Sequence, residues 1–139
     1  MIKNYRIIID TNLWISFLIT NKYSQLDFLL LSKKCTLVFS RDLMNEFLDV
    51  ASRPKISKYF SANDLEKLLK TINEYAVFIE VNSKIEFLKD AKDDFLLSLS
   101  VDGNVDYLIT GDKELIAVGQ YGKTVITNFT DFLEKILID

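Results

Sequence analysis

Acidic residues stand where apolar segments of this chain begin or end. Five of them are candidates for chemistry: Asp10, Glu46, Asp93, Asp94 and Asp112. Carboxylates that converge repel one another strongly unless a cation holds them. Ligation by oxygen alone favours Mg²⁺ or Mn²⁺ over zinc or copper. Such a site suits the hydrolysis of phosphodiesters, because the metal activates water, holds the phosphate and stabilises the developing charge.

The chain has no histidine and one cysteine. The absence of histidine excludes Ser-His-Asp and Cys-His triads, imidazole acid–base catalysis and His-ligated zinc. Cys35 cannot form a disulfide within the chain, and it begins the apolar segment Cys35–Phe39. We therefore interpret Cys35 as a small buried hydrophobic residue. The remaining chemistry must use carboxylates, hydroxyls, lysines or a hard metal.

Two apolar segments deliver acids in the same way. Tyr5–Ile9 is rich in β-branched residues, as a central parallel strand covered on both faces should be, and Asp10 follows it directly. Val105–Ile109 is a similar segment, and it ends in Thr110-Gly111-Asp112. Sites in parallel sheets lie beyond the carboxyl ends of the strands. We therefore expect both acids at one edge of a sheet.

Further strands and helices alternate along the chain, which is typical of an α/β fold with a mainly parallel sheet of about five strands. The other predicted strands are Cys35–Phe39, Ala76–Val81 and Thr124–Ile126. The predicted helices are two short ones after Leu13 that turn near Asn21, then Arg41–Ser52, one that begins after the capping pair Ser61 and Asp64, Phe95–Val101 and Phe129–Leu137.

Helices supply the other acids. Glu46 lies on the shoulder of the apolar stripe of its helix, so it can reach over the sheet edge while the helix stays packed. Asp93 and Asp94 open an almost wholly apolar helix, whose first turn therefore points into the fold. The alternative is capping, in which Asp10, Asn12 or Asp93 satisfies free amides at a helix start. One cap does not require two adjacent acids.

Length and charge set the wider limits. The 139 residues suit a single domain, residues 1–139, and a hydrophobic content of 49% fits a globular core. No apolar run approaches the roughly 18 residues that span a bilayer, and residues 1–5 lack signal-peptide features, so we expect a cytoplasmic protein with no membrane partner. The charge of −3 disfavours a polyanionic partner. Without the five candidate acids, however, 15 acidic residues remain beside 17 basic ones, so the rest of the chain carries a net charge of +2.

Four stretches, taken in order, carry a family resemblance. They are Ile9–Asn12, Glu46 in a helix after the second strand, Asp93–Leu96 and Tyr107–Leu115. Their order and spacing resemble a PIN domain across essentially the whole chain. More narrowly, they resemble the prokaryotic branch of toxins related to the VapC-type ribonucleases of toxin–antitoxin modules. The resemblance implies a three-layer α/β/α fold and a Mg²⁺- or Mn²⁺-dependent endoribonuclease.

The resemblance also implies a role for each acid. Asp10, Glu46, Asp94 and Asp112 match the four acids of the family; Asp94 fits the spacing before Asp112 better than Asp93 does. By that match Asp10 and Asp112 hold the principal metal. Asp94 shares it or positions the attacking water, and Glu46 binds a second metal or acts as base. Asp93 is left as a supplementary residue behind them.

Other residues and partners follow from the same match. Asn12 and Thr110 correspond to the small polar residues that orient the acids. Candidate phosphate contacts, with solvated surface charge as the alternative, are Arg41, Arg53, Lys55 and Lys113. RNA is the implied substrate, and a cognate antitoxin protein and a homodimer are implied partners.

Two other functions compete with this interpretation. A receiver-like phosphoacceptor also gathers acids at strand ends, but it has paired acids at the first strand and a lysine at the last, unlike this chain. A catalytically idle PIN-like module that binds RNA or protein is the second alternative. Such a module has no need for mutually repelling carboxylates, which favours the nuclease.

Overall fold

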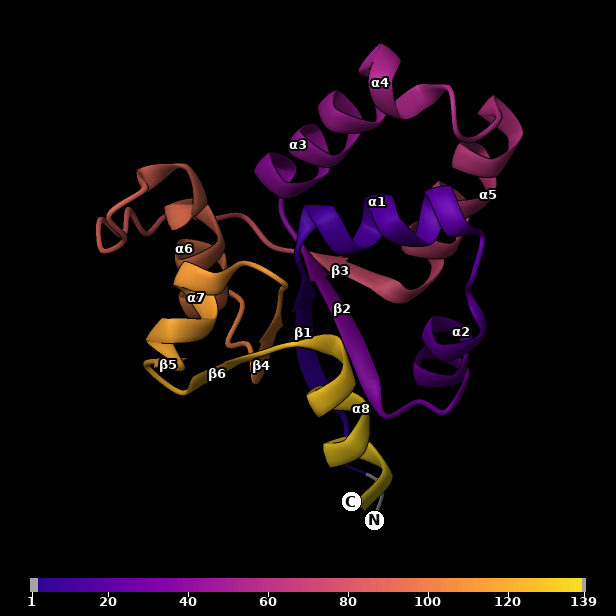
Figure 1. The fold of residues 1–139 in the computed structure, drawn as a ribbon. Helices are drawn as coiled ribbons and strands as arrows, with labels where there is room; N and C mark the ends of the chain where they lie inside the picture. The colour runs from indigo at the N-terminus through magenta and orange to yellow at the C-terminus, as the bar shows by residue number, and fades with distance from the viewer. Residues whose placement is uncertain (1–2, 139) are drawn as a thin grey trace.

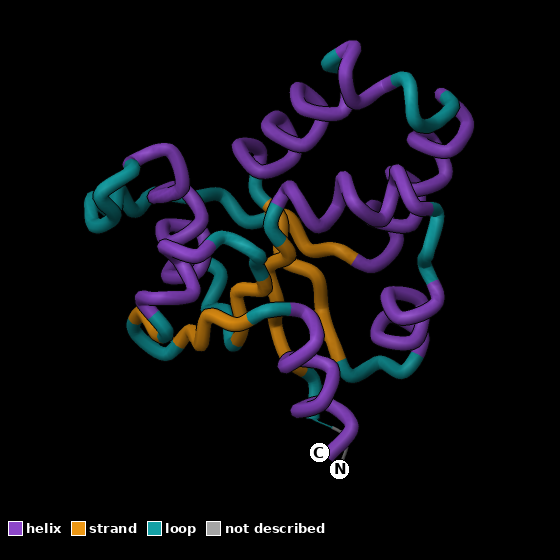
Figure 2. The backbone as a smooth tube through the Cα atoms, in the orientation of Figure 1, coloured by secondary structure: helices purple, strands orange, loops and turns teal. Residues whose placement is uncertain are grey.

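Within residues 3–138, the part of the chain that the computed structural model describes, six strands form one sheet in the order β3-β2-β1-β4-β6-β5 (Figures 1 and 2). The strands are β1 (Tyr5–Ile9), β2 (Cys35–Phe39), β3 (Ala76–Phe78), β4 (Tyr107–Ile109), β5 (Gln120–Tyr121) and β6 (Thr124–Thr127). The first four strands in chain order and β6 pair in parallel, and β5 pairs with β6 antiparallel. The predicted α/β class with a mainly parallel sheet is confirmed.

Helices cover both faces of this sheet, as the three-layer arrangement requires. They are α1 (Thr11–Thr20), α2 (Ser24–Leu31), α3 (Arg41–Ser52), α4 (Pro54–Ser57), α5 (Ala62–Tyr75), the 3₁₀ turn η1 (Ala91–Asp93), α6 (Asp94–Asp102), α7 (Lys113–Val118) and α8 (Phe129–Ile138). Figure 1 shows α6 and α7 on one side of the sheet and α1, α2 and α5 on the other. The rings of Phe17 and Phe129, 5.5 Å apart, place α8 against α1.

The central strands are buried as their composition predicts. Ile7, Ile8 and Ile9 are at most 1% exposed, and so are Leu108 and Ile109 of the neighbouring strand. Burial of this apolar surface is the main favourable contribution to folding and fixes the strands that carry the candidate acids. None of the helices in residues 3–138 is long and apolar enough to cross a membrane.

Cys35 begins β2 and is buried, as predicted. Burial raises the pKa of its thiol to about 12, an effect that neighbouring Lys34 opposes. A thiol in this environment stays protonated at neutral pH and is a poor nucleophile. Cys35 is therefore a packing residue.

Two edge regions differ from the prediction. β3 ends at Phe78 and not at Val81, because β2 ends at Phe39, whose carbonyl accepts the last bond, from the amide of Ile79 at 2.8 Å. β5 and α7 were not predicted. β5 has two residues in a hairpin that turns at Gly122 with a φ of 57°, too short to show strand periodicity.

The segment after β3, residues 79–90, runs along α6 and is called the strap here. Its backbone amides donate to side chains of α6 that are spaced one helical turn apart. Asn82 and Ser83 donate to Asp102 at 2.6 and 2.8 Å, and Ile85 donates to Ser98 at 3.0 Å. The strap thus obtains acceptors for its amides from one face of a helix instead of from a sheet.

Candidate active site

Asp10 and Thr110 meet at the carboxyl edge of the sheet. Ile9 and Ile109 are paired in the parallel register of β1 and β4, so the next residue of each strand lies beside its counterpart. The Thr110 hydroxyl donates to Asp10 Oδ2 at 2.7 Å. Asp10 is 5% exposed and Thr110 is fully buried. The register therefore places Asp10 beside Thr110, and the Thr110 hydroxyl orients the Asp10 carboxylate.

Asp112 joins the same network through the Thr110 hydroxyl. The backbone amide of Asp112 donates to Thr110 Oγ1 at 3.0 Å, and Asp112 Oδ1 accepts from the amide of Leu115 at 3.1 Å. Asp112 is thus the N-cap of α7. Capping and participation in the site are not exclusive here, because the cap uses one oxygen of the carboxylate.

Glu46 reaches the site from α3, which packs against α1. The hydroxyl of Thr11 donates to Glu46 Oε2 at 2.6 Å. Thr11 is the first residue of α1 and is 3% exposed. We did not predict this role for Thr11. The available signal was a hydroxyl residue directly after Asp10. At the start of α1 the side chain of Thr11 points toward the neighbouring helix α3.

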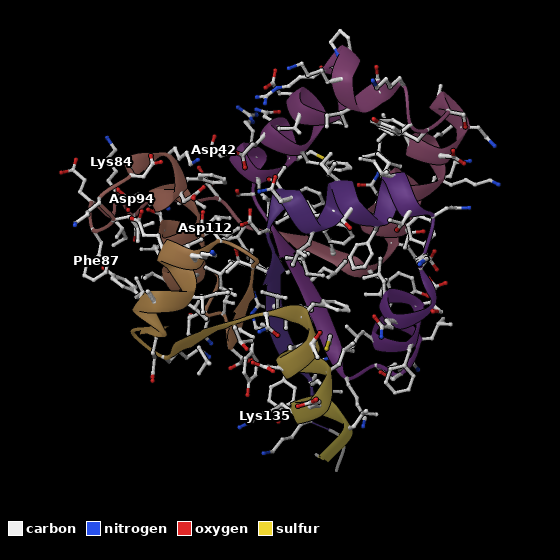
Figure 3. All side chains as sticks on the ribbon, viewed as in Figure 1. Asp42, Lys84, Phe87, Asp94, Asp112 and Lys135 are labelled. Atoms are coloured by element: carbon white, nitrogen blue, oxygen red, sulfur yellow. The ribbon has the colours of Figure 1, made fainter. Side chains whose placement is uncertain are left out.

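Asp93 and Asp94 lie differently from the predicted arrangement. Asp94 is buried, and its Oδ1 accepts from the strap amides of Leu88 and Phe87 at 2.9 and 3.3 Å. Asp94 and Phe87 lie on the same side of the molecule in Figure 3. Asp93, which ends η1, is the member of the pair that lines a pocket with Asp10. Asp94, which we predicted as one of the four site acids, does not line this pocket; its carboxylate faces the strap.

The acids line one cavity of about 230 Å³, called the carboxylate pocket here. Its charged lining residues are Asp10, Glu46, Asp93, Asp112, Arg53 and Lys92. Asn12 and Thr11 also line it, so the predicted Asn12 is present. Lys92 was not singled out from the sequence. Arg41, Lys55 and Lys113 are not among the residues lining this pocket.

The acids of the carboxylate pocket affect one another electrostatically. Burial raises the pKa of Asp10; the hydrogen bond from Thr110 opposes this, and the charges of Glu46 and Asp112 add to it. The pKa of Asp93 rises to about 6, first through burial and then through Asp10 and Asp112, against the influence of Lys92. Carboxylates that raise one another's pKa in this way are expected at a site that binds a cation.

The donor set suits a hard divalent metal. Carboxylate oxygens and the side-chain amide of Asn12 are ligands of the kind that Mg²⁺ and Mn²⁺ take. As the side chains lie, no group of three or more His, Cys, Asp or Glu residues within residues 3–138 is close enough together to hold a metal ion. The chemistry of the residues fits the metal, and binding it would require the carboxylates to move closer together.

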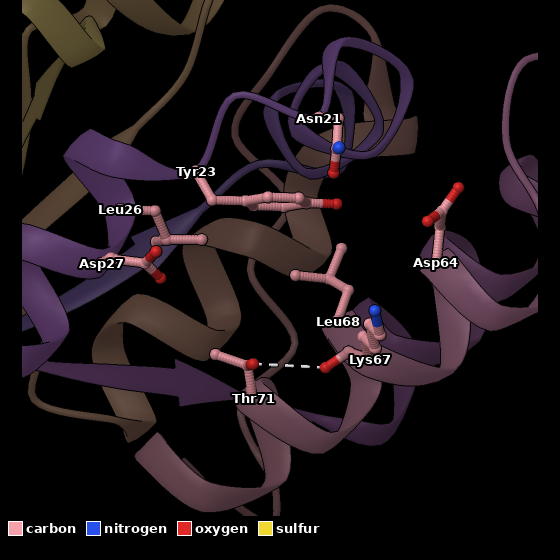
Figure 4. A pocket seen from close by; sticks show the side chains of 8 residues that line it. All are labelled: Asn21, Tyr23, Leu26, Asp27, Asp64, Lys67, Leu68 and Thr71. Carbon is pink, nitrogen blue, oxygen red and sulfur yellow. Dashed lines mark hydrogen bonds between the residues drawn. The ribbon is translucent and has the colours of Figure 1, made fainter.

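A different cavity lies beside the turn between α1 and α2, against α5 (Figure 4). Its polar groups belong to helix structure: the Thr71 hydroxyl donates to the carbonyl of Lys67 at 3.2 Å, and Asp64 forms a capping box with Ser61. Burial raises the pKa of Tyr23 in its wall. None of the candidate acids lines this cavity, so it does not extend the site.

Comparisons with known proteins agree with the geometry. Residues 6–114 match the PIN domain family. The chain is also similar to the solved structure of the PIN domain of human SMG5, with 15% sequence identity and a TM-score of 0.50, over 94% of this chain and 97% of that one. At this identity the likeness shows the fold alone. No curated protein matches the chain.

The family match covers most of the chain and contains the four acids of the carboxylate pocket. PIN domains are typically nucleases, and they generally bind divalent metals. The receiver-like alternative has no support in this match. By fold and by sequence, the chain belongs to the PIN domain family.

Proposed function

We propose that this PIN domain is a metal-dependent endoribonuclease that hydrolyses RNA phosphodiester bonds with Mg²⁺ or Mn²⁺. The observation that carries the proposal is the carboxylate pocket, which four acids from separate parts of the chain line together. Burial and mutual repulsion raise the pKa of Asp10 and Asp93 there. A merely structural role would not gather like charges at a partly buried edge of the sheet.

The residues divide the work as follows. Asp10, Asp93 and Asp112 would hold the metal, and Glu46 would hold a second ion or accept a proton from the attacking water. When bound, the metal supplies activation of that water and stabilises charge on the phosphate. Thr110 and Thr11 keep the Asp10 and Glu46 carboxylates oriented through their hydrogen bonds. Assigning Asp93 instead of Asp94 to this set departs from the resemblance and follows the geometry.

Two cations on the rim suit an anionic substrate. Arg53 and Lys92 line the pocket beside the acids, and each is paired with an exposed carboxylate, Asp49 at 3.0 Å and Asp90 at 3.6 Å. Exposed ion pairs of this kind contribute little and exchange readily. Arg53 and Lys92 can therefore turn from these partners to the phosphates that flank the cleaved bond.

The test is cleavage of a panel of single-stranded and structured RNAs by the purified chain in EDTA, Mg²⁺ or Mn²⁺. We expect metal-dependent cleavage that Asp10→Asn abolishes in a protein that remains folded. Unchanged cleavage by Asp10→Asn would show that the site assignment is wrong. RNA binding without cleavage under every metal condition would show that the enzymatic proposal is wrong.

A PIN-like module that binds RNA or protein without cutting is the second candidate. The observation in its favour is that the described acids do not form a ready group of three metal ligands. Titration of Mn²⁺ into the folded chain separates the two. Saturable binding that disappears in Asp112→Asn supports the nuclease, whereas no binding supports the idle module.

The resemblance to toxins of toxin–antitoxin modules extends the proposal. We propose that residues 1–139 act as one PIN-like unit in the cytoplasm, as a homodimer that a cognate antitoxin protein neutralises. Induced expression in a bacterial host should then arrest growth, and Asp10→Asn should not. Growth arrest by both proteins would point to toxicity of another origin. Light scattering of the purified chain tests the dimer directly.

A further inference from the structure

Another cavity, of about 480 Å³, lies beside the carboxylate pocket. It is formed where β2 and β3 end and α3 begins, and it is called the β3 hollow here. Its lining includes Ser40, Arg41, Asp42, Phe78, Glu80 and Val81. We propose that the β3 hollow binds one unpaired RNA base beside the cleaved phosphate, and that guanine fits it best. This inference rests on the proposed nuclease function and names its substrate preference.

The β3 hollow and the carboxylate pocket are adjacent. Asp42 lines the first, and Glu46, Val50 and Arg53 line the second. These four residues follow one another at three- and four-residue intervals, so the first three lie along one face of α3 and Arg53 caps its C-terminal end. The strands β3, β2 and β1 are also neighbours, which puts the tips of β3 and β1 roughly 10 Å apart. Neighbouring nucleotides of one strand can span that separation.

Phe78 supplies a surface for stacking. It is 50% exposed at the end of the edge strand β3, although it is a large apolar side chain. The ring of Phe39, which is buried, lies 5.7 Å from it and supports it from within the sheet. A half-exposed ring that is held in place is the platform on which unpaired bases stack in single-stranded RNA complexes.

The charged side chains of the β3 hollow favour a base over a phosphate. Asp42 and Glu80 are exposed acidic residues, and Arg41 is the one positively charged residue that lines the hollow. Within residues 3–138, the side chains of these three residues form no hydrogen bond or ion pair with the protein, so they are available to a ligand. Two carboxylates would repel a phosphate. They would accept hydrogen bonds from the N–H groups of a base.

Guanine matches this set of donors and acceptors best. Its Watson–Crick edge carries two adjacent donors, N1–H and the N2 amino group, which one carboxylate can accept together. Its O6 and N7 atoms are acceptors for an arginine such as Arg41. The corresponding edges of adenine, cytosine and uracil do not offer two adjacent donors. The carboxylate of Glu80 or Asp42 therefore distinguishes guanine from the other bases.

A peptide strand added to the β3 edge is the competing occupant. β3 has three residues, which gives a short edge for strand addition, and the hollow beside it has three charged lining residues. Both features favour the base. The test includes this competitor as an outcome.

The experiment measures binding of the heptanucleotide UUUNUUU, with G, A, C or U at the centre, to Asp10→Asn protein by fluorescence anisotropy in EDTA and in Mg²⁺. We expect the G form to bind at least about fivefold more tightly than the others. Glu80→Gln should reduce this preference to within about twofold. Phe78→Leu should weaken binding of all four by about tenfold, since leucine keeps contact with Phe39 but cannot stack.

Phe28→Leu is the matched control, because Phe28 is a 45% exposed phenylalanine on α2 that lines another groove. Equal affinities of Phe78→Leu and Phe28→Leu, or no binding of any heptanucleotide, would overturn the base-binding inference. Perturbation of the amide signals of residues 76–78 by a peptide, and not by RNA, would identify the strand partner instead. Cleavage by the unmutated chain is scored separately, so failure of the nuclease proposal is distinguishable from failure of this one.

Discussion

The carboxylates of Asp93 and Asp94 belong to adjacent residues and serve different parts of the molecule. Asp94 Oδ1 accepts from the amide of Leu88 at 2.9 Å and holds the strap, whereas Asp93 lines the carboxylate pocket. One residue at the start of α6 therefore anchors a loop and its neighbour faces the proposed chemistry. Matched substitutions can separate these roles.

Asp93→Asn should reduce metal-dependent RNA cleavage by at least about 100-fold, since it removes a proposed metal ligand. Asp94→Asn should retain most cleavage but lower the free energy of unfolding by about 1–2 kcal/mol, because the charged acceptor of two part-buried strap amides is lost. Cleavage rates and urea denaturation of both variants check this. A stable but inactive Asp94→Asn would restore the assignment made from the family resemblance.

The free energy of unfolding, measured as a function of pH, should show that the ionised Asp93 carboxylate destabilises the metal-free folded protein. Its pKa is raised from 3.8 to about 6 in the folded state, first through burial. Between these values the folded state binds more protons than the unfolded state, so stability falls as pH rises through this interval. In EDTA at pH 7, Asp93→Asn should be more stable than the unmutated chain by on the order of 1 kcal/mol.

The same comparison at pH 4 provides the control for that prediction. Asp93 is then largely protonated in the folded state, so the gain from Asp93→Asn should be small. Denaturation curves at both pH values measure the difference. A gain of equal size at pH 4 and pH 7 would mean that charge is not its cause.

Thr110→Val should disturb the site more than the fold. Its hydroxyl lowers the pKa of Asp10 and accepts from the amide of Asp112, so its loss raises that pKa further. The acid limb of the pH–rate profile should move to higher pH, because metal binding needs an ionised Asp10. The pH–rate profile of the variant, measured at saturating metal and at low metal, tests this.

Thr124→Val is the matched control for Thr110→Val. Thr124, the first residue of β6, is also a buried threonine, and its hydroxyl donates to the carbonyl of Val105 at 2.7 Å, away from the candidate acids. Both variants should lose about 1–2 kcal/mol of stability. A shift of the pH–rate profile in Thr124→Val as well would assign the effect to general loosening of the fold.

Metal should stabilise the folded chain through the carboxylate pocket. Mn²⁺ at 100 times its dissociation constant should add about 2.7 kcal/mol to the free energy of unfolding, and EDTA should remove this gain. Asp112→Asn should abolish most of the response. Thermal unfolding with and without Mn²⁺ measures it. An equal response in the variant would place the ion at another site.

The sequence predicted those parts of the site that depend on strands. Asp10 and Thr110 each follow a buried run of apolar residues, and parallel pairing alone brings their positions together. The choice between Asp93 and Asp94 depends on the angle at which α6 begins. The Asp94 carboxylate is turned toward the strap, whose amides also donate to Ser98 and Asp102 of the same helix. A periodicity of apolar residues carries no information about such bonds.

The edge elements escaped prediction for a related reason. β5 has two residues and α7 has six, and neither is long enough for an apolar period to repeat. The early end of β3 is a property of its neighbour, β2, which has no further backbone groups to offer. Local sequence indicates that a segment can form a strand, whereas the length of the neighbouring strand determines where the pairing ends.

The contact between Asp10 and Thr110 also has a consequence for folding. Side chains of a strand alternate between faces, so a slip of β4 by one residue against β1 would send the Thr110 hydroxyl to the opposite face and deprive Asp10 of its donor. A misregistered molecule would then lack an assembled site altogether. Under the proposed function, molecules that pair their strands wrongly would not cleave RNA, because the site forms only in the native register.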